Sequence, residues 1–209
     1  MSDIVLQDIS KKYGQRIVFS CFSLTIEPGE FICISGESGK GKSTILNIMG
    51  LLDYPDSGDV IIKGQKNANL HSNSGRRLVR NEIAYVFQNY GLVEDQTVNY
   101  NMKIAARFSG KNSIIDYNYA LEEVGLHQGV LKQKIYQLSG GEQQRVALAR
   151  LHVKPSSIIL ADEPTGSLDS TNRDVIMNIL KKHNEAGKTL VVVTHDKEIE
   201  KCANRVVRL

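Results

Sequence analysis

A glycine-rich loop between an apolar run and a helical pattern places the strongest constraint on the fold of this chain. The loop GESGKGKS at 36–43 follows the apolar run FICIS and precedes STILNIMGLL, which has helical apolar spacing. Glycines let several backbone N–H groups turn toward one anion, and the start of a helix adds donors and a positive dipole end. The loop matches the pattern G-x-x-x-x-G-K-[ST] at every position, so it predicts a phosphate-binding strand–loop–helix unit.

The side chains of this loop predict contacts to a nucleotide and to a metal ion. Lys42 is expected to reach the β- and γ-phosphates, and Ser43 to offer its hydroxyl to Mg²⁺. Lys40 adds a charge that we expect to be solvated. The residues predicted to contact the nucleotide here are Gly36, Glu37, Ser38, Gly39, Lys40, Gly41, Lys42, Ser43 and Thr44.

Two later runs indicate the strands that accompany the loop. SIILADEP at 157–164 and TLVVVTHD at 189–196 are apolar at successive positions. Strands of a parallel sheet that is covered on both faces have this pattern, whereas half-exposed strands alternate. A helical pattern over about 171–186 separates the two runs. Together these segments predict an α/β fold with a parallel core sheet.

The other segments add two layers to this core. Residues 3–9 and 17–26 alternate between apolar and polar, which is typical of an antiparallel layer. Residues 97–126 have helical apolar spacing. We therefore predict a single domain over 1–209: a parallel core sheet, an N-terminal antiparallel β layer and a helical subdomain inserted over about 89–152.

Polar residues stand at the ends of three predicted strands: the runs at 157–164 and 189–196, and IAYVFQ at 83–88. Asp162 and Glu163 are consecutive, so their side chains diverge. We predict that Asp162 holds Mg²⁺ and that Glu163 polarises the attacking water as general base. The Gln88 amide is expected to touch both the metal and that water, and His195 to contact the γ-phosphate or fix the water. The other four histidines are interpreted as surface or packing residues.

Charge and composition exclude several classes of function. The net charge of +3, from 26 Lys and Arg against 23 Asp and Glu, is too slight to favour nucleic acid or an anionic membrane surface. The three cysteines, Cys21, Cys33 and Cys202, match neither a zinc pattern nor a disulfide framework, which favours a reducing cytosol. No apolar stretch approaches the roughly 18 residues of a membrane helix, so we expect no direct membrane insertion.

A second glycine-containing segment, LSGGEQQRVALAR at 138–150, has two features that conflict. Ser139 and Glu142 have the spacing of a capping box at a helix start. Gly140 and Gly141 lie between them, and each costs roughly 0.8–1 kcal/mol relative to alanine within a helix. Two weak helix formers at this position indicate that something comes very close to the backbone there.

With the phosphate loop, this segment, the acidic pair and His195 in this order, the chain resembles ABC-type ATPase subunits over essentially its whole length. By this resemblance Gln88 is the Q-loop glutamine, residues 167–169 are the D-loop with Asp169 as a nucleotide contact, and His195 is the switch histidine. Tyr13 is then the aromatic residue that stacks on the purine, whereas its sequence context alone is equally that of a hairpin aromatic. The segment DEPTGSLDS is similar to that of the MacB, lipoprotein-release and FtsE-like branch of the family. The segment FQNYGLVEDQTVNYNM resembles that of ATP-binding subunits of bacteriocin exporters.

The resemblance implies an ATPase that uses ATP and Mg²⁺ and associates head to tail with a second ATPase subunit, expected to be a second copy. Each ATP would lie between the phosphate loop of one copy and Ser139, Gly140, Gly141 and Glu142 of the other. A permease would hold the pair at the cytoplasmic face of the cell membrane and export a peptide, bacteriocin, antibiotic or lipoprotein-like substrate.

Three other functions stay open or fit less well. A regulatory or mechanical subunit that gates a membrane partner without transport would carry the same catalytic residues. A soluble ABC protein of translation or DNA repair usually has two such domains or a long coiled coil, which this sequence lacks. A GTPase or small-molecule kinase would leave the segment at 138–150 unexplained.

Overall fold

The computed structural model describes residues 1–109, 116–166 and 170–209. Its strands, in chain order, are β1 (Ile4–Tyr13), β2 (Arg16–Ile26), β3 (Phe31–Ser35), β4 (Ser57–Ile62), β5 (Gln65–Lys66), β6 (Ile83–Val86), β7 (Ile158–Asp162), β8 (Thr189–Val193) and β9 (Arg205–Arg208). Its α-helices are α1 (Lys42–Met49), α2 (Asn73–Asn81), α3 (Val98–Ala106), α4 (Tyr117–Glu122), α5 (Gly140–Val153), α6 (Ser170–Glu185) and α7 (Lys197–Glu200). Two 3₁₀ helices, η1 (Gln128–Lys132) and η2 (Ile135–Gln137), precede α5.

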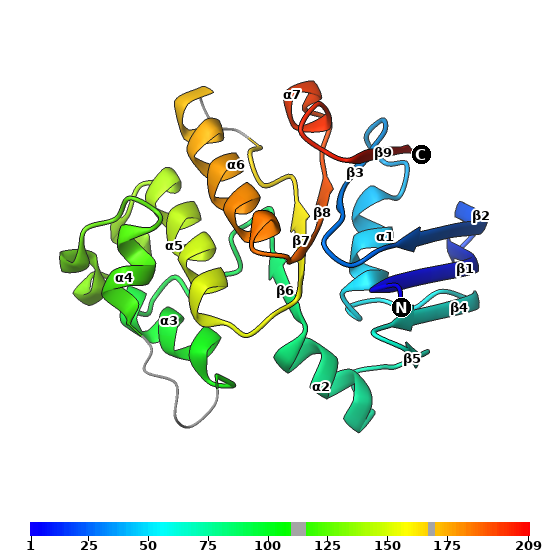
Figure 1. The fold of residues 1–209 in the computed structure, drawn as a ribbon, viewed down its shortest axis with the longest axis horizontal. Coiled ribbons are helices and arrows are strands. Elements are labelled where there is room, and N and C mark those ends of the chain that lie inside the picture. The colour runs from blue at the N-terminus through cyan, green and yellow to red at the C-terminus, as the bar shows by residue number, and fades with distance from the viewer. Residues whose placement is uncertain (110–115, 167–169) are drawn as a thin grey trace.

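The described strands form two sheets. One is antiparallel with the order β2-β1-β4-β5, and the other is parallel with the order β6-β7-β8-β3-β9. In Figure 1 the antiparallel sheet lies at the right, α1 stands between it and the parallel strands, and α3, α4 and α5 lie at the left. The predicted parallel core and antiparallel layer are both present.

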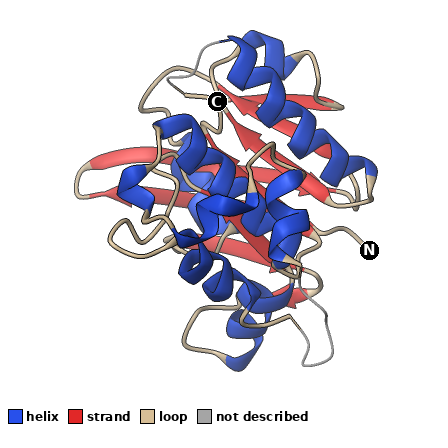
Figure 2. Ribbon diagram, turned by 90° about the vertical axis from the view of Figure 1, so that its left-hand side faces the viewer, coloured by secondary structure: helices blue, strands red, loops and turns tan. Residues whose placement is uncertain are grey.

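Two separate cores explain why the central strands are apolar at successive positions. In β7, Ile158 and Leu160 pack with α1 and the antiparallel sheet, whereas Ile159 and Ala161 pack with the helices on the other face. Strand β8 divides in the same way. Seen from the left-hand side of Figure 1, these helices lie in front of the strands (Figure 2). Apolar burial on both faces fixes the position of each strand end, and the polar residues discussed below follow those ends.

The regular elements described between β6 and β7 are all helices, joined by turns and irregular segments. They are α3, α4, η1, η2 and α5, which pack on one another through buried residues such as Met102 and Leu148. The bounds of 89 and 152 for a separate inserted subdomain stay a prediction. Across the described ranges, we find no helix that is both long and apolar enough to span a membrane.

No element was predicted at β5, α2, α7 or β9, and α2 and β9 illustrate the reason. Helix α2 buries only Gly75 and Leu78, so its sequence lacks the apolar periodicity that identifies a helix; the Ser72 hydroxyl, which accepts a hydrogen bond from the Gly75 N–H, marks its start. Strand β9 is a short edge strand beside β3 and has no fully buried residue. Both are stabilised by neighbours distant in sequence.

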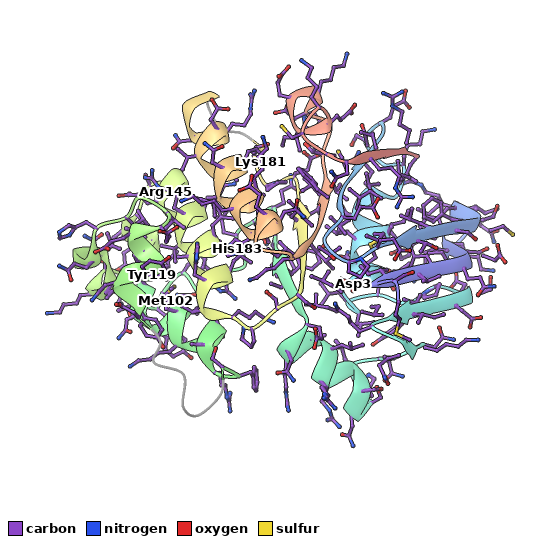
Figure 3. All side chains as sticks on the ribbon, in the orientation of Figure 1. Asp3, Met102, Tyr119, Arg145, Lys181 and His183 are labelled. Atoms are coloured by element: carbon purple, nitrogen blue, oxygen red, sulfur yellow. The ribbon has the colours of Figure 1, made fainter. Side chains whose placement is uncertain are left out.

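Two histidines meet inside the helical layer. His183 of α6, labelled in Figure 3, lies against His152 of α5, with 4.5 Å between ring centroids. Tyr119 of α4 meets His152 edge to face at 6.5 Å. Burial lowers the pKa of His183 to about 3, and it also lowers the pKa of His152. Both rings therefore pack in the neutral form, in agreement with the interpretation of these residues as packing residues.

Candidate active site

The phosphate loop connects the end of β3 to the start of α1. Gly41 is the N-cap of α1 and has a φ of 92°, in the left-handed region that glycine tolerates best. A Cβ atom at Gly41 would lie 2.3 Å from Cγ1 of Val18 in β2. Two constraints therefore require glycine here: the left-handed backbone conformation and the close approach of the antiparallel sheet.

Lys42 lies over this loop. Its Nζ donates hydrogen bonds to the carbonyl oxygens of Gly36 at 2.8 Å and Glu37 at 3.0 Å, and the residue is only 8% exposed. An ammonium held this way places one positive charge inside the curve of the loop. The side chain of Lys40, by contrast, points to solvent and lies 4.0 Å from the exposed Glu37 carboxylate.

Asp162 is the last residue of β7 and faces the loop. Ser43 Oγ donates a hydrogen bond to Asp162 Oδ1 at 3.1 Å. Burial raises the pKa of Asp162 and the neighbouring Glu163 charge adds to this, while the Ser43 hydrogen bond and Lys42 act in the opposite direction. A cation bound beside this carboxylate would offset the cost of burying its charge.

The residues present fit a magnesium ion. Ser43, Asp162 and Gln88 supply oxygen atoms, the ligand type that Mg²⁺ prefers. Gln88 lies in the loop after β6, two residues beyond the strand end, and lines both the cavity at the phosphate loop and an adjoining hollow shared with Asp162. Among the described residues there is no cluster of three or more His, Cys, Asp or Glu side chains that would hold a metal without phosphate or water.

Glu163 points in another direction. Its carboxylate accepts a hydrogen bond from Thr194 Oγ1 at 3.1 Å and lies 2.9 Å from Nδ1 of His195. Its backbone has a φ of 45°, unusual for a residue other than glycine, and its N–H donates to the Val193 carbonyl at 2.9 Å. The acidic pair thus serves two targets: Asp162 faces Ser43, and Glu163 faces the residues that follow β8.

A cavity of about 330 Å³ joins most of the predicted residues. The predicted residues that line it are Tyr13, Ser38, Gly39, Gly41, Lys42, Ser43, Thr44, Gln88 and Glu163. Arg16 and Val18 also line the cavity and were not predicted. Their position follows from the β1–β2 register, which pairs Tyr13 with Arg16 across the hairpin.

Tyr13 lines this cavity and is 53% exposed. Its Oη donates a hydrogen bond to Asp53 Oδ2 at 2.5 Å, and the Lys11 ammonium lies 5.0 Å from its ring centroid. The hydrogen bond to Asp53 is the main reason that the pKa of Tyr13 is raised. The phenol is therefore oriented by its own chain, with an accessible ring beside the phosphate loop.

The start of α5 lies apart from this cavity. Ser139 and Glu142 form the predicted capping box: the Ser139 N–H donates to Glu142 Oε2 at 2.8 Å, and the Glu142 N–H donates to Ser139 Oγ at 3.3 Å. The hydrogen bonds from Ser139 lower the pKa of Glu142. None of the residues from Ser139 to Glu142 lines the cavity at the phosphate loop, and Asp169 lies outside the described residues.

The two glycines between Ser139 and Glu142 have space around them. A Cβ atom at Gly140 would have its nearest neighbour, Tyr90 Oη, at 3.5 Å, and one at Gly141 would have the Asn172 side chain at 3.8 Å. Both are ordinary contact distances. Packing within the described part of the chain therefore does not require glycine at either position.

A buried amide connects α5 to the acidic strand. Gln144 of α5 is 3% exposed, and its Nε2 donates a hydrogen bond to the carbonyl oxygen of Pro164. Pro164 directly follows Glu163, so the helix that begins at Ser139 is hydrogen-bonded to the backbone beside the acidic pair. This contact was not predicted, because a glutamine inside a helix gives no sign of its partner.

Comparison with known proteins identifies this arrangement. The family model described as "ABC transporter" matches residues 19–166. The chain is 40% identical over 209 residues to the macrolide export ATP-binding/permease protein MacB of Campylobacter jejuni, across 99% of this chain and 32% of MacB. It is also 40% identical over 217 residues to MJ0796 of Methanocaldococcus jannaschii, an uncharacterized ABC transporter ATP-binding protein, across 99% of this chain and 92% of that protein.

Solved structures of MJ0796 have the same fold. One, a dimeric ABC transporter cassette, has a TM-score of 0.89 and 39% identity across 99% of this chain and 94% of that chain. Another, a dimeric post-hydrolysis state bound to ADP and Pi, has a TM-score of 0.88 and 38% identity across 99% and 94%. The predicted fold class is confirmed. The chain spans about a third of the length of MacB.

Proposed function

The chain belongs to the ABC transporter family and hydrolyses ATP to ADP and phosphate, and we propose that this reaction drives a membrane permease that exports its substrate. The MacB relative supports export, since its name describes a macrolide export ATP-binding/permease protein. The proposed substrate is a peptide, bacteriocin, antibiotic or lipoprotein-like molecule. The permease would hold the chain at the cytoplasmic face of the membrane.

The site residues support a division of labour during hydrolysis. Lys42 would hold the β- and γ-phosphates, because its ammonium already lies inside the curve of the loop. Glu163 would accept a proton from the attacking water, with Thr194 and His195 holding its two carboxylate oxygens in place. Bound Mg²⁺, held by Ser43, Asp162 and Gln88, would neutralise charge on the phosphates.

The open start of α5 is the observation that carries the proposed pairing. Gly140 and Gly141 expose backbone N–H groups at a helix start, yet they lie outside the cavity of their own chain. Helix N-termini bind anions, and the cavity at the phosphate loop would hold one that needs more donors. Two copies arranged head to tail would bring each α5 start to the ATP of the other copy, in agreement with the dimeric structures of MJ0796.

Mixing two inactive variants tests this pairing. Glu163→Gln is expected to bind ATP and dimerise while its hydrolysis falls at least about a hundredfold. Ser139→Arg is expected to bind ATP as a monomer and not to hydrolyse it. A mixed dimer would contain one site with both defects and one site with none, so equal mixing should restore about a quarter of the wild-type rate. Failure of the mixture to recover activity would argue against shared sites.

Transport requires a separate test. The ATPase would be reconstituted in vesicles with the membrane protein that co-purifies with it, and ATP-dependent movement of labelled peptides and macrolides would be measured. Glu163→Gln serves as the control that binds nucleotide without turnover. Hydrolysis that responds to the membrane partner without movement of any substrate would favour the gating alternative.

A further inference from the structure

Arg16 has no role in the function described above, although it lines the nucleotide cavity. It is the first residue of β2 and lies opposite Tyr13 at the end of the hairpin. Its Nη2 donates a hydrogen bond to the carbonyl oxygen of Gly39 at 2.5 Å. The guanidinium therefore connects the hairpin that carries Tyr13 to the phosphate loop.

The contact with Gly39 is close. The φ of Gly39 is 78°, and a Cβ atom there would lie 3.2 Å from Arg16 Nη2, tighter than most real Cβ contacts. Glycine at this loop position thus leaves room for the guanidinium to lie against the backbone. A phosphate loop turns N–H groups toward the anion, so a carbonyl that points away needs a donor of its own.

Among the described residues, no carboxylate forms an ion pair with the Arg16 guanidinium. Lys11 pairs with Asp53, and Lys40 lies 4.0 Å from the Glu37 carboxylate. A guanidinium has five N–H donors, and one of them is used on Gly39. The remaining donors lie on a planar group that suits two oxygen atoms of one phosphate.

The position of Arg16 along the cavity selects the part of the nucleotide that it would meet. Tyr13 stands at the proposed purine end, and Lys42 at the proposed β- and γ-phosphate end. Arg16 lies opposite Tyr13 across the hairpin, and its side chain is hydrogen-bonded to the phosphate loop, which leads to Lys42. On this basis, which rests on the proposed contacts of Tyr13 and Lys42, we infer that Arg16 is a nucleotide-binding residue that holds the α-phosphate side of ATP against the phosphate loop.

This placement separates binding from hydrolysis. ATP and ADP share the α-phosphate, so loss of Arg16 should weaken both to the same degree. The scissile γ-phosphate, Glu163 and the attacking water lie beyond its proposed reach. The maximal rate at saturating ATP should therefore stay close to that of the wild type, while KM rises.

The test compares Arg16→Ala, Arg16→Gln and the wild type, with Lys12→Ala as a matched control. Lys12 is an exposed lysine of the same hairpin that does not line the cavity, so its loss removes one positive charge from the same region. Calorimetry would give the Kd for ATP and for ADP at two salt concentrations, and steady-state assays would give KM and kcat.

Arg16→Ala is expected to raise the Kd for ATP and for ADP about tenfold each, with little change in kcat, because a charge-assisted hydrogen bond is lost. Arg16→Gln keeps a donor for the Gly39 carbonyl but loses the charge, so it should bind as weakly as Arg16→Ala. Lys12→Ala should bind like the wild type. The salt dependence of ATP binding should be smaller in both Arg16 variants.

Three results would overturn the inference: unchanged affinity in Arg16→Ala, wild-type affinity in Arg16→Gln, or weakening of ATP alone. The second would reduce Arg16 to a support for the loop, and the third would place it at the γ-phosphate. A wild-type chain that failed to bind ATP would instead contradict the proposed function, so the two failures are distinguishable.

Discussion

Replacing Gly141 with alanine is expected to stabilise the isolated chain and to abolish its hydrolysis. Gly141 lies in the first turn of α5, outside the left-handed backbone region, and an added Cβ atom would have its nearest neighbour at 3.8 Å. Alanine in a helix is favoured over glycine by about 0.5–1 kcal/mol. For a chain of this length, this gain should raise the Tm by roughly 1–4 °C.

The effect on hydrolysis should have the opposite sign. If the α5 start of one copy closes over the triphosphate of the other, the new methyl group would occupy space that the phosphate needs. The backbone N–H donors would then lie too far from the charge that develops during the reaction. Losing one such donor typically lowers kcat by about 10²–10³-fold. Binding of ATP to the monomer should not change, because Gly141 is not part of that cavity.

Three measurements on one preparation decide the outcome: thermal unfolding without nucleotide, ATP affinity at low protein concentration, and hydrolysis at high protein concentration. Asn178→Ala is the matched control, because Asn178 is exposed within α6 and the substitution raises helix propensity there. That variant should be stabilised and fully active. Wild-type hydrolysis by Gly141→Ala would show that nothing approaches this backbone and would refute the reasoning.

Two further predictions concern stability. Gly41→Ala should lower the free energy of unfolding by roughly 2–5 kcal/mol in a urea titration, since a left-handed alanine would also clash with Val18; a loss below 1 kcal/mol would contradict this. The pKa values of His183 and His152 are lowered by burial, so the unfolded chain gains protons first as the pH falls below about 6.5. Stability should fall from there toward pH 3 through His183, by up to about 1.4 kcal/mol per pH unit, and His152 acts in the same direction. His183→Leu should flatten the slope, and equal slopes in both proteins would exclude His183 as the cause.

Much of the fold could be predicted because burial on both faces leaves a strong signal. The runs that became β7 and β8 are apolar at successive positions, and the structure divides these apolar side chains between two cores. The loop at 36–43 was equally predictable, since its glycines and Lys42 act through local backbone geometry. Elements held by distant neighbours were missed: α2 buries two residues, and β9 is half-exposed at a sheet edge.

The candidate site was predictable where one residue type implies one chemistry. Asp162 and Glu163 follow a buried strand, and the structure gives them different partners. Arg16 and Thr194 were missed because an arginine beside a turn and a threonine in an apolar strand are common in any domain. Their contacts depend on the β1–β2 register and on the position of β8 beside β7, which the sequence pattern does not specify. The roles assigned to the site residues stay predictions.

The hydrogen bond between Gln144 and the Pro164 carbonyl has a consequence for a pair of copies. In a head-to-tail dimer the α5 start of one copy would serve the partner's ATP, whereas Glu163 of that copy would serve its own. Gln144 belongs to α5, and Pro164 directly follows Glu163. This one buried hydrogen bond would therefore connect the two ATP sites within each subunit. A displacement of α5 caused by the partner's nucleotide would then shift the backbone beside Glu163, the proposed catalytic base of the same subunit. The nucleotide state of one site would thereby influence the geometry of the catalytic base in the other, while each site keeps its own complete set of catalytic residues.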